Sequence, residues 1–371
     1  MAKEISLDAI QGVLQSESIE NLKMTEIYEL FRKESSIANF RPESIFQIDP
    51  RNGELIVYNS SRANRPHSDA TKPIESQKNT EDNCPICAGK TTGIMDLTKL
   101  SEGHTFINKN MFPIFFPFEE DPSDYMESVS FGLHFLQWTS SLHNIDWHNI
   151  SQSDGVIVLK RLAALEKKLL LDSKGYMPVS ESEVPDKITY GYVSIIKNFG
   201  KIAGGSLAHG HQQIVASNIM PKQIFNNWNF YMNNQENFTK FLLSMNPEEL
   251  IVKEYRDAIL LVPYFMRRPY DMFLILKDTS KKFLHELNEE ELETISLAWG
   301  EATRAILKIL KHSNKEEAYN VTINNGPGAG LYFEFLPFTQ LIGGYEKIGL
   351  WVCQESPAKA ADVLRNFIEN G

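Results

Sequence analysis

The sequence predicts an α+β protein made of two similar units, each an antiparallel sheet flanked by helices. The order strand, strand, helix, strand occurs twice along the chain, without the strict strand and helix alternation that a parallel sheet requires. The 371 residues, 42% of them hydrophobic, are enough to fill two ordinary cores. We therefore expect a helical extension over residues 1–40, a first unit over residues 41–220 and a second unit over residues 221–371.

Apolar spacing and turn residues predict the elements of the first 220 residues. The extension carries Ile27, Leu30 and Phe31 at roughly helical spacing in a charged background. A turn at residues 49–53 joins two short runs into a β-hairpin. A helix is expected over residues 156–171, where leucines recur on one side. The strands expected here cover residues 43–50, 53–59, 104–110, 130–140, 188–198 and 212–217.

The second unit follows a linker near Pro221. A helix is expected over residues 289–311, because Asn288 is a favourable N-cap and Glu291 can complete a capping box. Pro357 opens a last helix, since proline is tolerated in the first helical turn. The strands expected in this unit cover residues 258–265, 271–278, 331–337 and 350–354.

Charge and cysteine content limit the kinds of protein this chain can be. A formal net charge of −11 disfavours a nonspecific nucleic-acid surface but allows a local basic pocket for a phosphorylated small molecule. No run approaches the roughly 18 apolar residues of a membrane span, and the N-terminal stretch has no apolar signal core. Three cysteines are too few for a disulfide scaffold. We expect a cytoplasmic protein with no nucleic-acid or membrane partner.

Residues 198–217, NFGKIAGGSLAHGHQQIVAS, hold the most informative polar pattern. His209, His211 and Gln213 stand at every second position, so in an extended strand they share one face at about 6 to 7 Å intervals. In the preceding bend, glycines leave backbone N–H groups able to approach an anion, and a serine adds a hydroxyl. The bend residues are Gly200, Gly204, Gly205 and Ser206. The pattern predicts a phosphate site beside a histidine nucleophile.

Cys84 and Cys87 have the spacing of half a metal site. Alone, the pair could be a zinc knuckle, half a redox pair or two buried thiols, and a complete tetrahedral zinc site needs two more nitrogen or sulfur ligands. The candidates are His143, with which His148 competes, and His209. Together with the histidine strand, the pair indicates a site for Zn²⁺ held by two cysteines and two histidines. Such a site would be structural, because four protein ligands leave no position for a water molecule.

His211 is then available for chemistry at phosphorus. A neutral imidazole is nucleophilic near neutral pH and forms a covalent intermediate, although His211 could instead bind zinc beside His209. Gln213 could donate its amide to a phosphate oxygen in the transition state, or be an ordinary polar strand residue. Arg62 and Arg65 have the fork geometry that suits phosphate oxygens, or could be solvated loop charges.

These motifs resemble the galactose-1-phosphate uridylyltransferase family of the histidine-triad superfamily. The family's phosphate-loop pattern, Asn, Gly, Ser, then His-Pro-His-x-Gln, is matched in register with glycine in place of proline. The matching residues are Asn198, Gly204, Ser206, His209, Gly210, His211 and Gln213. The R-x-x-R-P, C-P-x-C and F-x-N motifs occur at residues 62–66, 84–87 and 106–108, and His143 stands where the next zinc ligand is expected. The resemblance covers residues 41–370.

The resemblance implies tandem histidine-triad-like domains, a homodimer and a double-displacement reaction. His211 would attack the α-phosphorus of a nucleoside diphosphate sugar, expel sugar 1-phosphate and hold the nucleotide as a phosphoramidate. A second phosphorylated acceptor would then take the nucleotide. The resemblance also assigns Gln213 and Ser206 to the phosphoryl group, Arg62 and Arg65 to the charge around it, Asn198 and Gly204 to the phosphate loop, and Asn108 to the nucleoside. Gly205, from the glycine bend, is expected to contact the phosphate as well.

Two segments of the second unit depart from the family pattern. Many members carry a second metal site there, but its histidine positions hold Thr279, Gly330 and Tyr332, so we expect this site to be lost. The hexose-contacting segment is matched at Tyr345 and Glu346, while Val352 occupies the position of an expected glutamine.

Three functions are compatible with these motifs. The first is a nucleotidyltransferase that exchanges a nucleoside monophosphate between a nucleoside diphosphate sugar and a sugar 1-phosphate by ping-pong chemistry. The second is a phosphorylase of ADP-sugars or dinucleoside polyphosphates, with inorganic phosphate or a sulfate analogue as acceptor. The third is a nucleotide-binding protein without catalysis, which the altered second unit suggests and the intact histidine motif disfavours.

Overall fold

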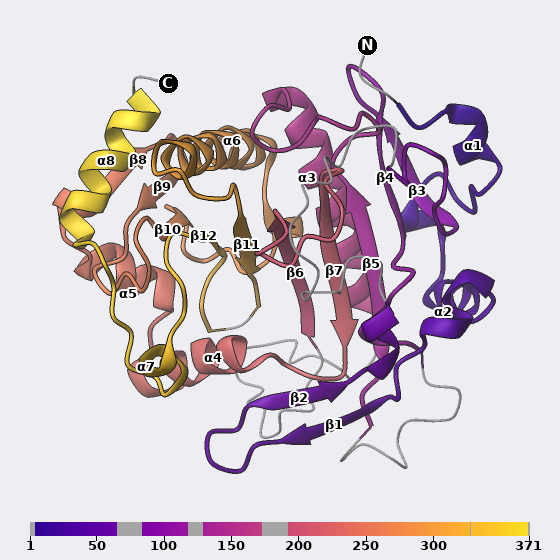
Figure 1. Cartoon of the computed structure of the whole chain (residues 1–371), viewed down its shortest axis with the longest axis horizontal. Coiled ribbons are helices and arrows are strands. Elements are labelled where there is room, and N and C mark those ends of the chain that lie inside the picture. The colour runs from indigo at the N-terminus through magenta and orange to yellow at the C-terminus, as the bar shows by residue number, and fades with distance from the viewer. Residues whose placement is uncertain (1–3, 65–83, 118–128, 173–191, 327, 370–371) are drawn as a thin grey trace.

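One ten-stranded antiparallel sheet organises the fold (Figure 1). In this computed structural model, the described residues are 4–64, 84–117, 129–172, 192–326 and 328–369. The strand order of the large sheet is β3-β4-β5-β7-β6-β11-β12-β10-β9-β8, and β1 and β2 form a separate hairpin. All the strand pairs in the described residues are antiparallel, and helices flank the sheet, which confirms the predicted α+β class.

The strand bounds show which strand predictions hold. The strands are β1 (Ile45–Ile48), β2 (Leu55–Tyr58), β3 (Ile94–Lys99), β4 (His104–Lys109), β5 (Gly132–Trp138), β6 (Tyr192–Phe199), β7 (His211–Ser217), β8 (Ile251–Glu254), β9 (Ala258–Leu261), β10 (Met272–Leu276), β11 (Tyr319–Asn324) and β12 (Tyr332–Pro337). The predicted hairpin is confirmed as β1 and β2. The other confirmed strands are β4, β5, β6, β7, β9, β10 and β12.

The two halves of the sheet have the same internal order. Counted from its outer edge, each half runs first, second, third, fifth and fourth strand, with a long helix between the third and the fourth. The halves join where β6 pairs with β11, so the two predicted units share one continuous sheet. The chain passes from one half to the other between β7 and the helix that starts at Lys222. We keep the boundary between residues 220 and 221 as a proposal.

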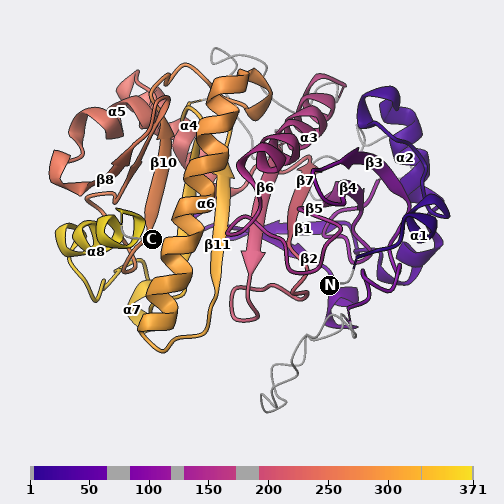
Figure 2. The same cartoon turned by 90° about the horizontal axis from the view of Figure 1, so that it is seen from above.

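Helices α3 and α6 lie side by side across one face of the sheet (Figure 2). The helices are α1 (Leu7–Gln11), α2 (Met24–Arg32), α3 (Gln152–Asp172), α4 (Lys222–Asn234), α5 (Phe238–Met245), α6 (Glu289–His312), α7 (Gly344–Lys347) and α8 (Pro357–Glu369). The predicted capping box of α6 is confirmed, since Asn288 and Glu291 exchange hydrogen bonds of 2.9 Å. The ring of Trp147, which precedes α3, stacks on that of Trp299 in α6 with 4.2 Å between centroids. In the described residues, every helix is too short or too polar to cross a lipid bilayer.

The N-terminal segment contains α1 and α2 and packs into the core of the first half. Ile27 and Phe31 of α2 are fully buried, and the Phe31 ring meets that of Phe135 in β5 edge to face, with 5.0 Å between centroids. After this helix, the Glu34 carboxylate lies 3.1 Å from the buried ammonium of Lys109. The extension therefore completes the core around β4 and β5.

Several elements differ from the sequence predictions. The strands β3, β8 and β11 and the short helices α4, α5 and α7 were not predicted. The predicted strand over residues 350–354 is wrong, because this segment is irregular and exposed, with Leu350 at 59% and Val352 at 52% exposure. Its backbone does not pair with a neighbouring strand: Leu350 donates to the Tyr345 carbonyl, and Val352 donates to the Glu346 side chain and accepts from that of Gln340. The presence of an apolar run in the sequence did not distinguish segments that form strands from the segment that is irregular.

Truncation of Phe31 to alanine tests whether the extension belongs to the cooperative core. Because this side chain is fully buried, Phe31→Ala should lower the free energy of unfolding by about 3–5 kcal/mol. Urea denaturation followed by circular dichroism measures the change. Leu7→Ala is the control, since Leu7 is 59% exposed and its loss should change stability by about 0.5 kcal/mol or less. Equal stability of the two variants would contradict the assignment.

Candidate metal centre and active site

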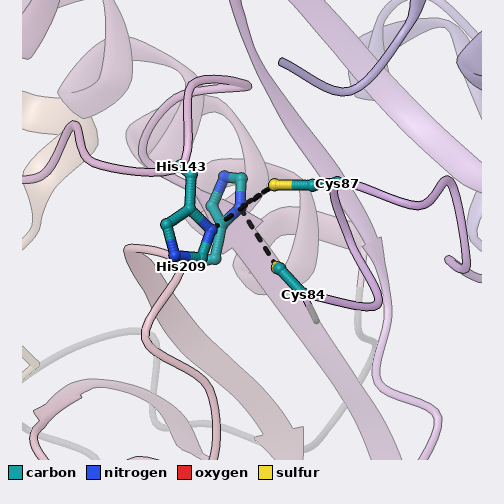
Figure 3. Close-up of side chains that lie close together, drawn as sticks. All are labelled: Cys84, Cys87, His143 and His209. Carbon is teal, nitrogen blue, oxygen red and sulfur yellow. Dashed lines mark hydrogen bonds between the residues drawn. The ribbon is translucent and has the colours of Figure 1, made fainter. Parts of the chain in front are cut away.

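Two cysteines and two histidines form a buried cluster at one end of the first half (Figure 3). The ligand atoms of Cys84, Cys87, His143 and His209 all lie within 4.8 Å of one another. The Cys87 sulfur is 3.4 Å from Nδ1 of His143 and 3.6 Å from Nδ1 of His209, and the Cys84 sulfur is 3.7 Å from Nδ1 of His209. In Figure 3 the four side chains point toward a common centre.

These separations fit a tetrahedral metal ion. With metal–sulfur bonds of about 2.3 Å and metal–nitrogen bonds of about 2.0 Å, a sulfur and a nitrogen ligand of zinc stand about 3.5 Å apart. Nε2 of His209 lies 2.8 Å from the Ser140 carbonyl oxygen, so Nε2 carries the hydrogen and Nδ1 keeps its lone pair for the metal. Burial lowers the pKa of His209 to about 4, which keeps this ring neutral. The cluster could therefore bind a metal such as zinc.

A tight turn and a small apolar core bring the cluster together. The Ala88 N–H donates to the Cys84 carbonyl at 3.1 Å, so the backbone curls and both thiols point the same way. Ile10, Phe106 and Trp138 pack around them. The competing His148 is not part of the cluster, since its ring packs against Phe199 at 5.8 Å.

His211 is the first residue of β7, and its ring is held from two sides. Nδ1 lies 2.8 Å from the His209 carbonyl oxygen, so it donates a hydrogen there and the lone pair of the neutral ring is on Nε2. Trp138, opposite His211 in the strand register, packs against the ring at 4.9 Å. His211 and Gln213 share one face of β7, whereas His209 lies in the loop before the strand. The same loop therefore joins a metal ligand to an oriented imidazole.

Gln213 is oriented by a histidine that sequence reasoning missed. Its Oε1 lies 3.1 Å from Nε2 of the fully buried His134 in β5. The backbone N–H of Ile114 donates to Nδ1 of His134 at 3.0 Å, so Nε2 carries the hydrogen and donates to Gln213. The carboxamide oxygen of Gln213 is thereby held toward β5, and its NH₂ group faces away. Alternation within β5 placed His134 on this face, but no motif distinguished it.

The glycine bend between β6 and β7 is closed by its own backbone. The N–H of Gly204 donates to the Lys201 carbonyl and that of Gly205 to the Gly200 carbonyl, each at 3.0 Å. The expectation that these two N–H groups are free for an anion is therefore wrong. Gly204 has a φ of 85°, and a Cβ on Gly205 would lie 2.8 Å from the Gly200 oxygen, so both positions favour glycine. Their contact with a phosphate stays a prediction.

A buried ion pair is hydrogen-bonded to the backbone at His211. The Lys197 ammonium lies 2.7 Å from Oδ2 of Asp146 and donates to the His211 carbonyl at 3.3 Å. Burial acts to raise the pKa of Asp146, but the nearby ammonium overcomes this and holds the pKa below its ordinary value, so the carboxylate is charged. A Cβ on Gly210 would lie 2.6 Å from Cγ of Asp146, which explains glycine at the position where proline was expected.

Asn108 acts on the site through a tryptophan. Its Nδ2 donates to the hydroxyls of Thr91 and Thr92, and its Oδ1 accepts from the Trp138 indole at 2.9 Å. These three hydrogen bonds of the amide are all to protein groups, and the tryptophan that it holds packs on His211. The predicted contact of Asn108 with a nucleoside is untested.

Of the remaining residues of the predicted site, Asn198 and Ser206 flank the glycine bend, and Arg62 lies in the segment after β2. Asn198, next to the end of β6, and Ser206 are half-buried at either side of the glycine bend. Arg62 is half-buried and donates to the Phe112 carbonyl at 2.6 Å. Arg65 lies outside the described residues. The phosphate-binding roles of these side chains stay predictions.

Tyr345 and Glu346 are not brought to the His211 cluster. Figures 1 and 2 both show α7 beside the elements of the second half and away from β7. Tyr345 is 65% exposed, and the Glu346 carboxylate accepts the N–H groups of Gly343 and Val352. Within the described residues, this segment therefore forms a separate surface feature.

Two of the three positions expected to have lost a second metal site, Gly330 and Tyr332, lie in close-packed surroundings, whereas Thr279 is half-buried. Tyr332 packs with Leu242 and Phe273 in an apolar cluster, so its ring occupies space between β12, α5 and β10. Gly330 has a φ of 78°, and a Cβ there would lie 2.2 Å from the Thr239 hydroxyl. These residues contribute packing between α5 and the sheet.

The fold of this chain is that of the solved uridylyltransferase structures. A solved uridylyltransferase structure superposes with a TM-score of 0.65 and 18% identity, covering 88% of this chain and 99% of that one. This likeness confirms the predicted resemblance. No family model matches the chain.

Among particular proteins, the chain is similar to ADP-glucose phosphorylase of Arabidopsis thaliana. The two sequences are 22% identical over 352 residues, covering 89% of this chain and 94% of the relative. A crystal structure of an ADP-glucose phosphorylase from Arabidopsis thaliana with bound ADP-glucose superposes with a TM-score of 0.60 and 18% identity, covering 86% of this chain and 98% of that one.

Metal content should depend on His209 but not on His211. His209→Ala removes a nitrogen ligand from the cluster, so bound zinc should fall from about one ion per chain to a small fraction, as in Cys84→Ala. His211→Ala, two residues further on, is the matched control and should retain the metal. Elemental analysis of the purified proteins measures the ratio. Full metal content in His209→Ala would remove this residue from the ligand set.

The Asp146 and Lys197 pair should be costly to break on one side only. Asp146→Asn or Lys197→Met leaves one buried charge without its partner and should lower the free energy of unfolding by about 3–5 kcal/mol. The double variant removes both charges and should cost less than the sum of the two. Urea denaturation at pH 7 gives the three values. Additive losses would show that the two groups do not act as a pair.

Proposed function

We propose that the protein transfers a nucleoside monophosphate from a nucleoside diphosphate sugar to a phosphate acceptor through a covalent nucleotidyl-His211 intermediate. The observation that carries the proposal is the hydrogen bond from Nδ1 of His211 to the His209 carbonyl, which leaves the lone pair on Nε2. The similarity to an ADP-glucose phosphorylase and to a uridylyltransferase supports the same reaction class.

In the first step, Nε2 of His211 attacks the α-phosphorus. An N–P bond forms, the bond from phosphorus to the oxygen of the sugar 1-phosphate breaks, and that oxygen leaves with the electron pair. The ring becomes positively charged, and its Nδ1–H, held by the His209 carbonyl, forms a stronger hydrogen bond as it does so. The NH₂ group of Gln213, turned away from His134, is available to a non-bridging phosphate oxygen.

In the second step, an oxygen of the acceptor attacks the same phosphorus and the N–P bond breaks. The electron pair returns to Nε2, and His211 is again neutral. We propose inorganic phosphate as the acceptor and an ADP-sugar as the donor, so that the products are ADP and a sugar 1-phosphate. The similarity to ADP-glucose phosphorylase in sequence, and in a structure with bound ADP-glucose, favours this form. A sugar 1-phosphate acceptor is the second candidate, supported by the similarity to uridylyltransferase.

The metal site and the surrounding side chains have supporting roles in this proposal. Zinc held by Cys84, Cys87, His143 and His209 would hold the loop that carries His211 in place. We assign the phosphates to Arg62, Arg65, Asn198, Gly204, Gly205 and Ser206, and the hexose to Tyr345 and Glu346 as contributed within a homodimer. These assignments follow the resemblance, and for Asn198, Gly204, Gly205 and Ser206 also the position of the residues in or beside the glycine bend.

A nucleotide adduct on His211 tests the proposal. Incubation with ADP-glucose should raise the mass of the protein by one AMP moiety, and peptide mapping should place the adduct on His211. His211→Ala should form no adduct, because the attacking nitrogen is gone, and should still bind the metal. Intact-protein mass spectrometry measures both. Inorganic phosphate should then remove the adduct and release ADP, whereas a sugar 1-phosphate should do so if the second candidate is right.

Two results would contradict this function. An adduct that persists in His211→Ala would assign the nucleophile elsewhere. If ADP-glucose, UDP-glucose, UDP-galactose and diadenosine tetraphosphate all leave the mass unchanged but bind tightly, the protein is a nucleotide-binding protein without this chemistry.

A further inference from the structure

A residue from the second half of the chain holds the glycine bend of the first half. Asn320 of β11 lies directly opposite Asn198 of β6 in the strand register. Its Nδ2 is 2.7 Å from Oδ1 of Asn198 and 2.9 Å from the carbonyl oxygen of Ala203, in the middle of the bend. One amide nitrogen therefore connects the end of β6 to the loop that follows it.

These contacts determine which way both side-chain amides face. A backbone carbonyl can only accept, so the atom of Asn320 that faces Ala203 must be its NH₂ nitrogen. The second hydrogen of that nitrogen then points to Asn198, which must present its oxygen. The NH₂ group of Asn198 is consequently turned away from β11, and it lies 3.7 Å from the place of a Cβ on Gly204. A donor is thus directed over the bend.

The bend also has little room to move away from β11. Gly200 has a φ of 83°, and a Cβ there would lie 2.4 Å from the Glu317 carbonyl oxygen, just before β11. The backbone of the second half therefore touches the start of the bend, while Asn320 holds its middle at Ala203. Asn198 and the bend keep one arrangement because both are held against the same strand.

We propose that Asn320 is a positioning residue for the transferred phosphoryl group. It keeps the NH₂ of Asn198 directed to the side where the phosphate is bound, and it holds the bend through Ala203. This inference rests on the proposed function, and it gives the second half of the chain a part in a site whose other oriented residues, His211 and Gln213, come from the first half. An inverted Asn198 would present its oxygen to the phosphate and repel it.

The decisive variant is Asn320→Asp, which keeps the shape and exchanges the donor for an acceptor. The carboxylate would face the Ala203 carbonyl without a hydrogen and would draw the NH₂ of Asn198 toward itself, so Asn198 would present oxygen to the phosphate. The rate of adduct formation with ADP-glucose should fall about 100-fold, comparable to the loss of one oriented donor. Thr322→Val, on the same face of β11 and bonded to Glu334, is the matched control and should stay within about twofold.

A double-mutant cycle separates positioning from general stability. If Asn320 acts through Asn198, Asn320→Asp should slow adduct formation far less in an Asn198→Ala background, by about threefold or less. Urea denaturation of the same proteins shows whether folding is affected. The inference is overturned if Asn320→Asp reacts at the rate of the wild type, or if it slows the reaction equally in both backgrounds.

Failure of the proposed function gives a different result. The wild type would then form no adduct, and the affinity for ADP-glucose, measured by calorimetry, takes the place of the rate. Under the inference, Asn320→Asp should weaken that binding at least tenfold and Thr322→Val should not. Unchanged affinity in Asn320→Asp, or a wild type that neither reacts with nor binds ADP-glucose, would overturn it.

Discussion

The candidate site depends on the three bonds made by one residue, His209. Nδ1 of its ring faces the two thiols, Nε2 donates to the Ser140 carbonyl, and its own carbonyl accepts from Nδ1 of His211. Each bond determines the next: the Ser140 contact selects the tautomer that can bind a metal, and the held backbone selects the tautomer of the neighbouring ring. The geometry that could hold a metal and the orientation of the His211 ring therefore both depend on His209.

The two halves of the continuous sheet carry different kinds of residue at corresponding positions. In the first half, the face opposite α3 carries His211 and Gln213, each oriented by a buried partner. In the second half, the corresponding region is filled by Tyr332 and its apolar neighbours. The junction of β6 with β11 allows the second half to keep a role, because strand pairing brings Asn320 within hydrogen-bonding distance of Asn198. A sheet divided into two separate parts could not make that contact.

Much of the site could be predicted from the sequence, because its residues fall in short motifs with local geometry. The two cysteines are three positions apart, and a single turn brings their thiols together. The choice between His143 and His148 was not decidable from spacing, since both follow β5 in one loop. Tertiary contacts decide it: Asp146 pairs with Lys197 and the His148 ring packs against Phe199. The strand β11, YNVTIN, was missed although it alternates; its partner β12 is the next strand in the chain, whereas its other partner, β6, lies far away in sequence.

The partners of the predicted residues were harder to find, because they act through pairing across the sheet. His134 and Asn320 lie in strands whose register no motif records, and they became meaningful only when strand pairing placed them beside Gln213 and Asn198. The bend showed the opposite error: its glycines were recognised, but their N–H groups close the turn itself.

Because residue 210 is glycine, the ordered conformation of the segment that carries His211 depends on contacts at the two ends of that segment. Glycine loses more conformational freedom on folding than any other residue, whereas proline would have restricted the unfolded chain in advance. The segment from His209 to His211 therefore has little local preference for its native shape and depends on contacts at both ends, the metal cluster on one side and Lys197 on the other. An ion in the Cys84, Cys87, His143 and His209 cluster would restrain one end of this segment, and its removal would leave only the Lys197 contact to restrain the other end.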